Sequence, residues 1–179
     1  MALAGPPGSG KSTAGRLAAE RLALDYRSAG EMFRAEAKRQ GMELEAFSRY
    51  AEQHEEVDRR LDDSMMALAK PGRLLDGRLV GALCRRRAIP SLYVVVTAAP
   101  EVRYRRLSER DRRPYDETVR ATLAREASER ERYRRYYGID LDAEHPDLTV
   151  DSSTLPAEAV ASRIVDFARS QHPGPGGSA

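Results

Sequence analysis

The sequence predicts an α/β fold: a parallel sheet of about five strands with helices on both faces, in three layers. Short apolar runs alternate along the chain with longer segments of helical periodicity. The run at 92–96 is β-branched and lacks polar alternation, which is typical of a central parallel strand that is buried on both faces. A glycine-rich loop with phosphate-binding spacing lies between the first apolar run and the first helical segment.

The remaining elements follow from the same patterns taken in order. Strands are expected at residues 1–4, 25–28, 73–76, 92–96 and 147–151. Helices are expected at 12–24, 30–39, 42–54, 57–70 and 80–87, from Pro100 to a break at 112–114, at 118–137, and from Pro156 onward. The first strand is very short, because only four residues precede Gly5. We expect one domain over 1–170, with a strand-free helical insertion at 30–70 and a disordered tail at 171–179.

The amino-acid composition limits the classes of function that the chain can have. The chain has 179 residues, of which 41% are hydrophobic and 32% charged, with a net charge of +2. This balance does not favour nucleic acid or a membrane as a partner, so we expect a cytoplasmic monomer that acts on small molecules. One cysteine, Cys84, excludes an internal disulfide and a multi-cysteine metal site. Three of the 30 basic residues are Lys, so most phosphate contacts must come from Arg.

Residues 5–12 fit the pattern G-x-x-x-x-G-K-[ST], a P-loop. Its glycines allow tight turns in which successive backbone N–H groups point inward at an anion, and the following helix adds its positive end. The Lys11 ammonium is expected on the β- and γ-phosphates of ATP, and the Ser12 hydroxyl on Mg²⁺. The expected nucleotide contacts are Gly5, Pro6, Pro7, Gly8, Ser9, Gly10, Lys11, Ser12 and Thr13.

The segment Asp76-Gly77-Arg78 follows an expected strand, so it should lie at the same sheet edge as the P-loop. An acid at this place resembles the Walker B position, which makes Asp76 a candidate Mg²⁺ ligand. Arg78 is a candidate phosphate clamp. The alternative is an ordinary Asp-Gly turn without a functional role.

Further arginines are candidates for an acceptor site. Arg34 lies one helical turn beyond Gly30 and is expected to contact the acceptor, unless it is a surface residue of an amphipathic helix. Residues 108–117, which include Arg110, are Arg-rich and contain a proline; they suit a short lid that closes on phosphates, or else a solvated loop.

Arg125, Glu129 and Arg132 share one face of a single expected helix, because they are spaced at i, i+4 and i+7. Two arginines on that face suit a clamp on a transferred phosphoryl group. The alternative is a ladder of salt bridges on a solvated helix, since several other arginines surround them.

Several segments together resemble those of cytidylate kinases, most closely the short archaeal type. They are the P-loop, Ser-Ala-Gly-Glu-Met-Phe-Arg at 28–34, Asp-Gly-Arg-Leu at 76–79, 125–133, Tyr-Gly-Ile-Asp at 137–140 and 147–153. The resemblance implies a P-loop kinase with a core, a monophosphate-binding insertion at 30–70 and a short lid at 108–117. It also implies that Arg34 and Arg78 hold the acceptor phosphate, with Arg125 and Arg132 on either side of the transferred group. By the same resemblance, Glu129 contacts the nucleoside or orients those arginines.

The chain departs from the resembled pattern in three ways. The first strand is short, Arg112-Arg113-Pro114 replaces a glycine-containing lid turn, and Asp76 stands where the short family has Glu. The expected activity is transfer of the ATP γ-phosphate to CMP or dCMP, with ATP and Mg²⁺ as cofactors. Alternatives are another P-loop kinase, for a modified cytidylate, of the adenylate type or for a hydroxyl acceptor, and a nucleotide-dependent switch without catalysis. Arginines in the acceptor cleft favour an acceptor that carries a phosphate.

Overall fold

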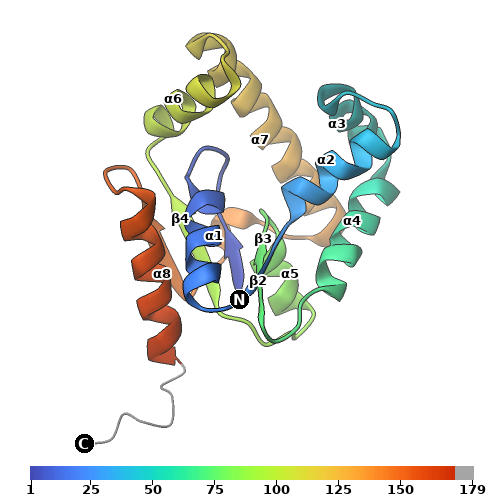
Figure 1. Ribbon diagram of the computed structural model, residues 1–179. Coiled ribbons are helices and arrows are strands. Elements are labelled where there is room, and N and C mark those ends of the chain that lie inside the picture. The colour runs from blue at the N-terminus through green and yellow to red at the C-terminus, as the bar shows by residue number, and fades with distance from the viewer. Residues whose placement is uncertain (172–179) are drawn as a thin grey trace, which may run out of the picture.

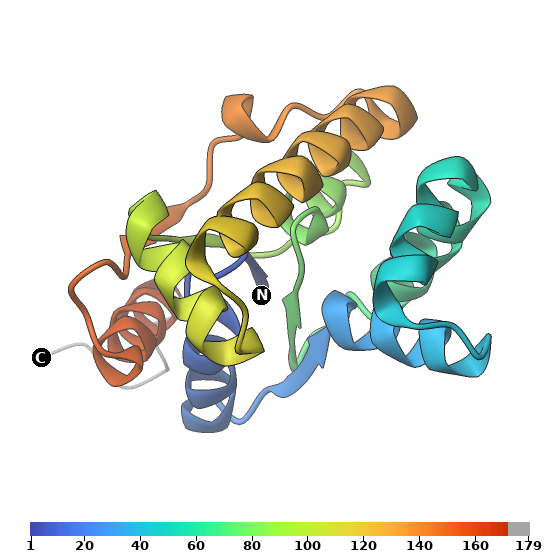
Figure 2. The ribbon, with the colours of Figure 1, turned by 90° about the horizontal axis from the view of Figure 1, so that it is seen from above.

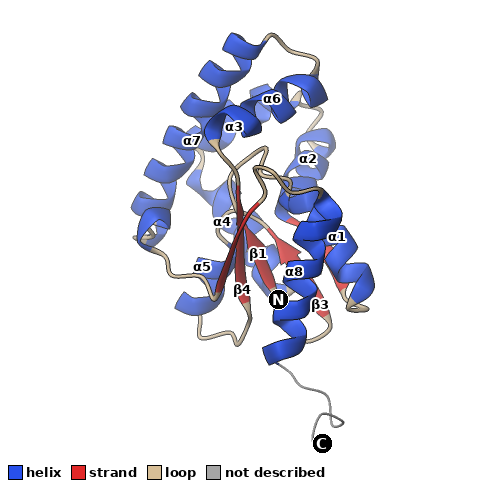
Figure 3. Cartoon of the chain, turned by 90° about the vertical axis from the view of Figure 1, so that its left-hand side faces the viewer, coloured by secondary structure: helices blue, strands red, loops and turns tan. Residues whose placement is uncertain are grey.

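A computed structural model describes residues 1–171, and residues 172–179, on which most of the expected disordered tail falls, lie outside the described residues. Five parallel strands form one sheet in the order β2-β3-β1-β4-β5. The strands are β1 (Ala2–Ala4), β2 (Asp25–Ser28), β3 (Arg73–Asp76), β4 (Tyr93–Thr97) and β5 (Leu148–Asp151). Figure 3 shows them side by side beneath the long helices. The predicted fold class is therefore confirmed.

Eight α-helices accompany the strands within residues 1–171, at the places that the sequence predicts. They are α1 (Lys11–Arg21), α2 (Ala29–Arg39), α3 (Leu44–Gln53), α4 (Glu55–Ala67), α5 (Val80–Arg86), α6 (Pro100–Asp111), α7 (Tyr115–Tyr137) and α8 (Ala157–Gln171), with a 3₁₀ turn at Leu141–Ala143. Gln171, expected in the tail, is the last residue of α8. No helix in residues 1–171 combines the length and the apolarity that a membrane span requires.

The short strand β1 holds the centre of the sheet although it has only three residues. Its successive side chains point to opposite faces, as in any strand. Leu3 belongs to the core beneath α1 and α8, whereas Ala2 belongs to the core beneath α4 and α5. Both are fully buried. In register, Leu3 pairs with Asp76 of β3 and with Val94 of β4, so the segments that follow these strands meet at one edge.

The helices α2, α3 and α4 occupy the segment where the insertion is expected, and they stand beside the sheet (Figures 1 and 2). This segment has a small core of its own, in which Phe47 is fully buried and its ring centroid lies 4.8 Å from that of Phe33. The helix α4 also packs on the sheet, because Met65 and Met66 belong to the core that contains Ala2 and Leu75. The insertion is therefore anchored to the sheet at the end of α4.

The helices α6 and α7 form a hairpin that rises above the carboxyl edge of the sheet (Figure 1). Only residues 112–114 separate them, and Arg112 ends α6 in a left-handed conformation with φ 51°. The helix α7 begins at Tyr115, three residues before the expected start, with Pro114 before it and Asp116 and Glu117 in its first turn. Acidic side chains in the first turn stabilise the start of a helix. Because α6 runs to Asp111 and α7 starts at Tyr115, most of the expected lid segment at 108–117 is helical.

Candidate active site

The P-loop takes the backbone conformation that its glycines permit. Gly5 has φ 145°, and a Cβ there would lie 2.1 Å from the carbonyl oxygen of Val96. Gly8 has φ 78°, and a Cβ there would lie 2.5 Å from the carbonyl oxygen of Arg103. Gly10 precedes α1, and no side chain of the described residues caps that helix. The first N–H groups of α1 are therefore available to an anion in the loop.

Asp76 connects the P-loop helix to the end of β3. Its carboxylate is buried, with Oδ2 accepting a 2.6 Å hydrogen bond from the Ser12 hydroxyl and another from the Tyr26 hydroxyl. Lys11 Nζ lies 3.5 Å from Oδ1, which has no hydrogen-bond partner among the described residues. A buried oxygen without a hydrogen bond is costly, so this atom suits a bound cation. Burial, together with the Asp76 carboxylate, raises the pKa of Tyr26.

Arg78 lies among carboxylates from α7. Its guanidinium is 3.7 Å from Oε1 of Glu126 and 3.5 Å from Oε2 of Glu129, and the three side chains are largely buried. One nitrogen of Arg78, Nη1, is buried without a hydrogen-bond partner in residues 1–171, as is Oε2 of Glu129. The carboxylates offset the charge of Arg78 but leave one of its donors for a ligand.

Arg34 lies near the end of β2. A Cβ on Gly30 would lie 3.5 Å from Nη1 of Arg34 and 3.7 Å from the Ser28 hydroxyl, so the guanidinium turns back toward the sheet. Gly77 packs directly against Ala29, which brings the segment of Arg78 next to the start of α2. No carboxylate of the described residues pairs with Arg34.

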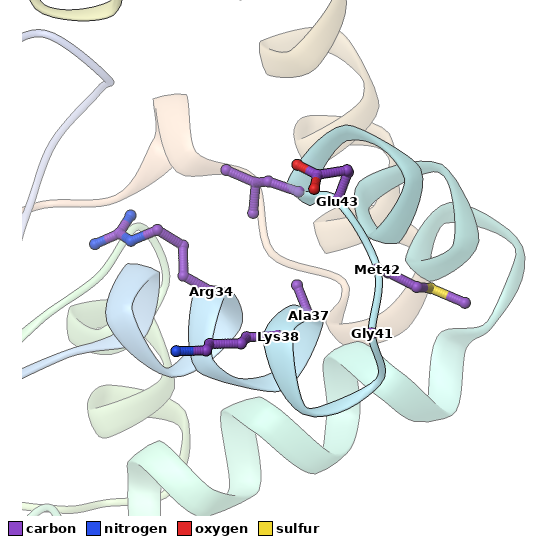
Figure 4. A pocket seen from close by; sticks show the side chains of 7 residues that line it. Arg34, Ala37, Lys38, Gly41, Met42 and Glu43 are labelled. Atoms are coloured by element: carbon purple, nitrogen blue, oxygen red, sulfur yellow. The ribbon is translucent and has the colours of Figure 1, made fainter.

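A hollow of about 470 Å³ borders Arg34 on the insertion. It is lined by Arg34, Ala37, Lys38, Gly41, Met42, Glu43 and Leu44. Figure 4 shows the side chains of Arg34 and Lys38 leaving α2 on the same side. Neither cation forms an ion pair within residues 1–171, so the pair favours an anion on that side of the helix.

The remaining expected arginines have different neighbours. Arg125 donates a 2.7 Å hydrogen bond to Oε1 of Glu129 and keeps 60% of its side chain exposed. Arg132 is largely buried and pairs with Asp58 of α4, so it does not lie beside Arg125 although both leave the same face of α7. Arg110 is exposed and pairs with its neighbour Asp111.

Further polar contacts join the α6–α7 hairpin to the insertion. Arg113 donates to Glu45 of α3, and the Tyr137 hydroxyl donates to Oδ2 of Asp62 on α4, both at 2.7 Å. Burial raises the pKa of Asp62 to about 6, and the nearby carboxylates of Asp58 and Asp63 contribute in the same direction. The insertion is thus held against α7 by charged side chains as well as by packing.

Sequence reasoning missed three contributors to the site. Arg103 of α6 is buried and donates to the carbonyl oxygen of Pro7 at 3.0 Å and to Glu126 at 2.7 Å. Arg106 donates to Ser152, whose hydroxyl donates to the carbonyl oxygen of Ser9. Tyr26 supports Asp76. No sequence spacing distinguishes Arg103 from the many other arginines. The one sequence feature that could have identified Tyr26 is its place in the strand β2, which lies at the edge of the sheet beside β3.

Comparison with known proteins gives consistent results. The family model described as "AAA domain" matches residues 1–134. The cytidylate kinase of Methanocaldococcus jannaschii is 39% identical over 163 residues, covering 89% of this chain and 92% of that one. The cytidylate kinase of Archaeoglobus fulgidus is 36% identical over 168 residues and covers 92% of each chain. The structure of shikimate kinase from Acinetobacter baumannii in complex with shikimate matches with a TM-score of 0.60 and 19% identity, covering 97% of this chain and 94% of that one, which shows a shared fold. With its P-loop and its extensive identity to these relatives, the chain belongs to the cytidylate kinase family.

Proposed function

We propose that this chain transfers the γ-phosphoryl group of ATP to the phosphate of CMP or dCMP, giving ADP and CDP or dCDP. The relatives that match over nine-tenths of the chain are named cytidylate kinases. The observation that carries the proposal is the buried Nη1 of Arg78, a donor without a hydrogen-bond partner in residues 1–171. Arg34, which has no ion pair within those residues, follows the neighbouring strand β2. A hydroxyl acceptor offers nothing for two such cations, whereas a nucleoside monophosphate presents a dianionic phosphate.

The donor side is the P-loop. Its backbone N–H groups and the Lys11 ammonium would hold the ATP phosphates. The donor set fits Mg²⁺, because the Ser12 hydroxyl keeps its lone pairs while it donates to Asp76, and Oδ1 of Asp76 has no hydrogen bond. When bound, Mg²⁺ supplies charge neutralisation on the phosphate oxygens. Tyr26 keeps the Asp76 carboxylate in one orientation.

The acceptor side is the edge formed by Arg34 and Arg78 at the ends of two neighbouring strands. Glu129 bridges Arg78 and Arg125 through its two oxygens, so it orients both guanidinium groups. An arginine fixed in this way loses little rotamer entropy when a phosphate arrives. The nucleoside would extend along α2, where Lys38 and the hollow at residues 37–44 lie.

Transfer forms a bond from an acceptor phosphate oxygen to Pγ and breaks the bond from Pγ to the β,γ-bridging oxygen. The reaction needs positioning and charge stabilisation rather than a general base. Lys11 and Arg125 are the proposed stabilising groups, and Arg132 joins them when its ion pair with Asp58 opens. The α6–α7 hairpin, with Arg110, is the proposed lid that excludes water.

A coupled assay of ADP release from Mg-ATP tests the proposal, with CMP, dCMP, UMP, AMP and GMP supplied in turn. We expect the highest kcat/KM for CMP and dCMP. A purine monophosphate in first place would contradict the acceptor assignment. Turnover only with sugar or cyclitol hydroxyls would make the chain a different kind of P-loop kinase. Size-exclusion chromatography with light scattering checks the expected monomer.

A further inference from the structure

Arg103 joins two parts of the candidate site that are far apart in the sequence. A single nitrogen, Nη1, donates to the carbonyl oxygen of Pro7 at 3.0 Å and to Oε1 of Glu126 at 2.7 Å. Only 8% of its side chain is exposed. The tip of the P-loop also rests on its backbone, because a Cβ on Gly8 would lie 2.5 Å from its carbonyl oxygen. The P-loop is thus seated on Arg103 by backbone and side chain together.

The same carboxylate that accepts from Arg103 faces the acceptor arginine. Oε1 of Glu126 lies 3.7 Å from Nη1 of Arg78, and the exposed fractions of these two side chains are 12% and 13%. Charges interact strongly at such distances when water is largely excluded. A displacement of Arg103 therefore changes the position or the charge balance of Arg78 through the carboxylate that both arginines face.

We propose that Arg103 is a positioning residue that couples the phosphate-binding loop to the acceptor arginine, Arg78, through the Glu126 carboxylate. Binding of ATP fixes the P-loop and with it the Pro7 carbonyl, the Arg103 guanidinium and the Glu126 carboxylate. With these groups fixed, Arg78 is held in the position that binds the acceptor phosphate. Each substrate therefore favours the binding of the other. The proposal rests on the proposed function, because it assumes that Arg78 binds the acceptor phosphate.

The geometry favours coupling over a purely structural role. A buried arginine that only supported the hairpin would need one carboxylate partner, and Glu126 supplies it. The additional bond to a P-loop carbonyl adds no packing within α6 or α7; its effect is to place the loop. Arg105, two residues further along α6, is exposed and has no carboxylate partner among the described residues, so it is a matched control.

Calorimetric titration tests the proposal without requiring turnover. CMP is titrated into the wild type, Arg103→Met, Arg78→Ala and the double variant, each with and without a nonhydrolysable ATP analogue and Mg²⁺. We expect Arg103→Met to weaken CMP binding about three- to tenfold in the wild-type background, and by less than about twofold where Arg78 is already alanine. The gain in CMP affinity that the ATP analogue produces should shrink in Arg103→Met. Arg105→Met should leave both affinities unchanged.

Two results would overturn the coupling role. One is an equal loss of CMP affinity in both backgrounds, which would show that Arg103 acts independently of Arg78. The other is unchanged CMP affinity in Arg103→Met. If this variant does not fold, as judged by its thermal melt, Arg103→Lys and Glu126→Gln give the same comparison with a smaller change in volume.

The outcome remains distinct from that of the proposed function. If the wild type neither binds nor phosphorylates CMP, the proposed acceptor is wrong. The same four proteins are then titrated with the monophosphate that supports the most ADP release, and the same two results decide on Arg103. If no monophosphate binds, Arg78 is not an acceptor residue and the coupling proposal fails with that assignment.

Discussion

The Ser12 hydroxyl donates a 2.6 Å hydrogen bond to Oδ2 of Asp76, and this bond joins the first turn of α1 to the end of β3. Both residues owe their positions to β1, whose Leu3 pairs with Asp76 in register. The bond fixes the orientation of the carboxylate and leaves Oδ1 facing Lys11. The first two predictions concern this group of residues.

Replacement of Lys11 should abolish transfer and preserve the fold. Lys11→Met removes the only lysine of the P-loop, whose charge offsets the negative charge on the β- and γ-phosphates in the transition state. We expect less than about one-tenth of wild-type turnover, a loss above about 1.4 kcal/mol in transition-state stabilisation. The coupled assay measures it, and Lys70→Met, at an exposed turn, is the control. Turnover near the wild-type value would remove the P-loop from the reaction.

Loss of the Tyr26 hydroxyl should lower the apparent affinity of the enzyme for Mg²⁺. Tyr26→Phe removes a donor to Oδ2 of Asp76 without changing the ring, so the carboxylate is held by Ser12 alone. A side chain that hydrogen-bonds a metal ligand orients that ligand, so its removal is expected to lower metal affinity more than the maximal rate. We expect the Mg²⁺ concentration for half-maximal activity to rise about threefold or more, with kcat at saturating Mg²⁺ little changed. Tyr115→Phe, at an exposed tyrosine, should have no effect.

Arg34→Ala and Arg78→Ala should each raise KM for CMP far more than KM for ATP. A hydrogen bond from a charged donor contributes about 1.5–3 kcal/mol, or about ten- to a hundredfold in affinity. Initial rates over a grid of both substrates give the two constants. Arg49→Ala, an exposed residue of the insertion, is the control. Equal increases in both KM values would place Arg34 and Arg78 outside the acceptor site.

Alanine at Arg125 or Arg132 should lower kcat by about tenfold or more, with little change in either KM. Such a result is expected of groups that contact the phosphoryl group mainly in the transition state. Arg130 and Arg134 lie on other faces of α7 and pair with Asp142 and Asp140, so they serve as controls. Similar effects of all four substitutions would make α7 a solvated charge ladder.

The stability of the chain should depend on pH through Asp62. Burial raises its folded pKa from 3.8 to about 6, so the folded state holds this proton more tightly than the unfolded chain. Wild-type stability therefore falls as the pH rises between these two values. The Asp62→Asn variant has no carboxyl group at this position, so its stability lacks this dependence on pH. The amide oxygen of the asparagine can still accept the hydrogen bond from the Tyr137 hydroxyl.

Urea unfolding of the wild type and Asp62→Asn at about pH 3.5 and about pH 7.5 measures the effect. The free energy of unfolding of the variant, relative to wild type, should increase by on the order of 2 kcal/mol from the lower to the higher pH. Asp63→Asn, at an exposed residue paired with Arg87, is the control. A difference that does not change with pH would show that Asp62 titrates normally.

The elements of the fold were predictable because their signals are local. The glycine spacing at 5–12 and the apolar run at 92–96 each identify a segment without knowledge of any partner. The sequence predicts the start of α7 three residues late, because a proline is typical of a break. Here Pro114 directly precedes the helix, and Asp116 and Glu117 stabilise its first turn.

The candidate site was only partly predictable, because an ion pair depends on distances that sequence spacing does not give. Arg125 and Arg132 share a helix face, yet Arg125 pairs with Glu129 of the same helix and Arg132 pairs with Asp58 of α4. Arg103 contacts the P-loop across a sequence separation of 96 residues. Among so many arginines, no sequence pattern distinguishes the few whose side chains are largely buried.

The reliance on guanidinium groups has a consequence for small inorganic anions. A guanidinium presents a planar fork of N–H donors that fits the oxygens of a phosphate group. Inorganic phosphate and sulfate therefore resemble the group that Arg34 and Arg78 are proposed to hold. Both ions should compete with the acceptor nucleotide, and they should do so more strongly than chloride at the same ionic strength.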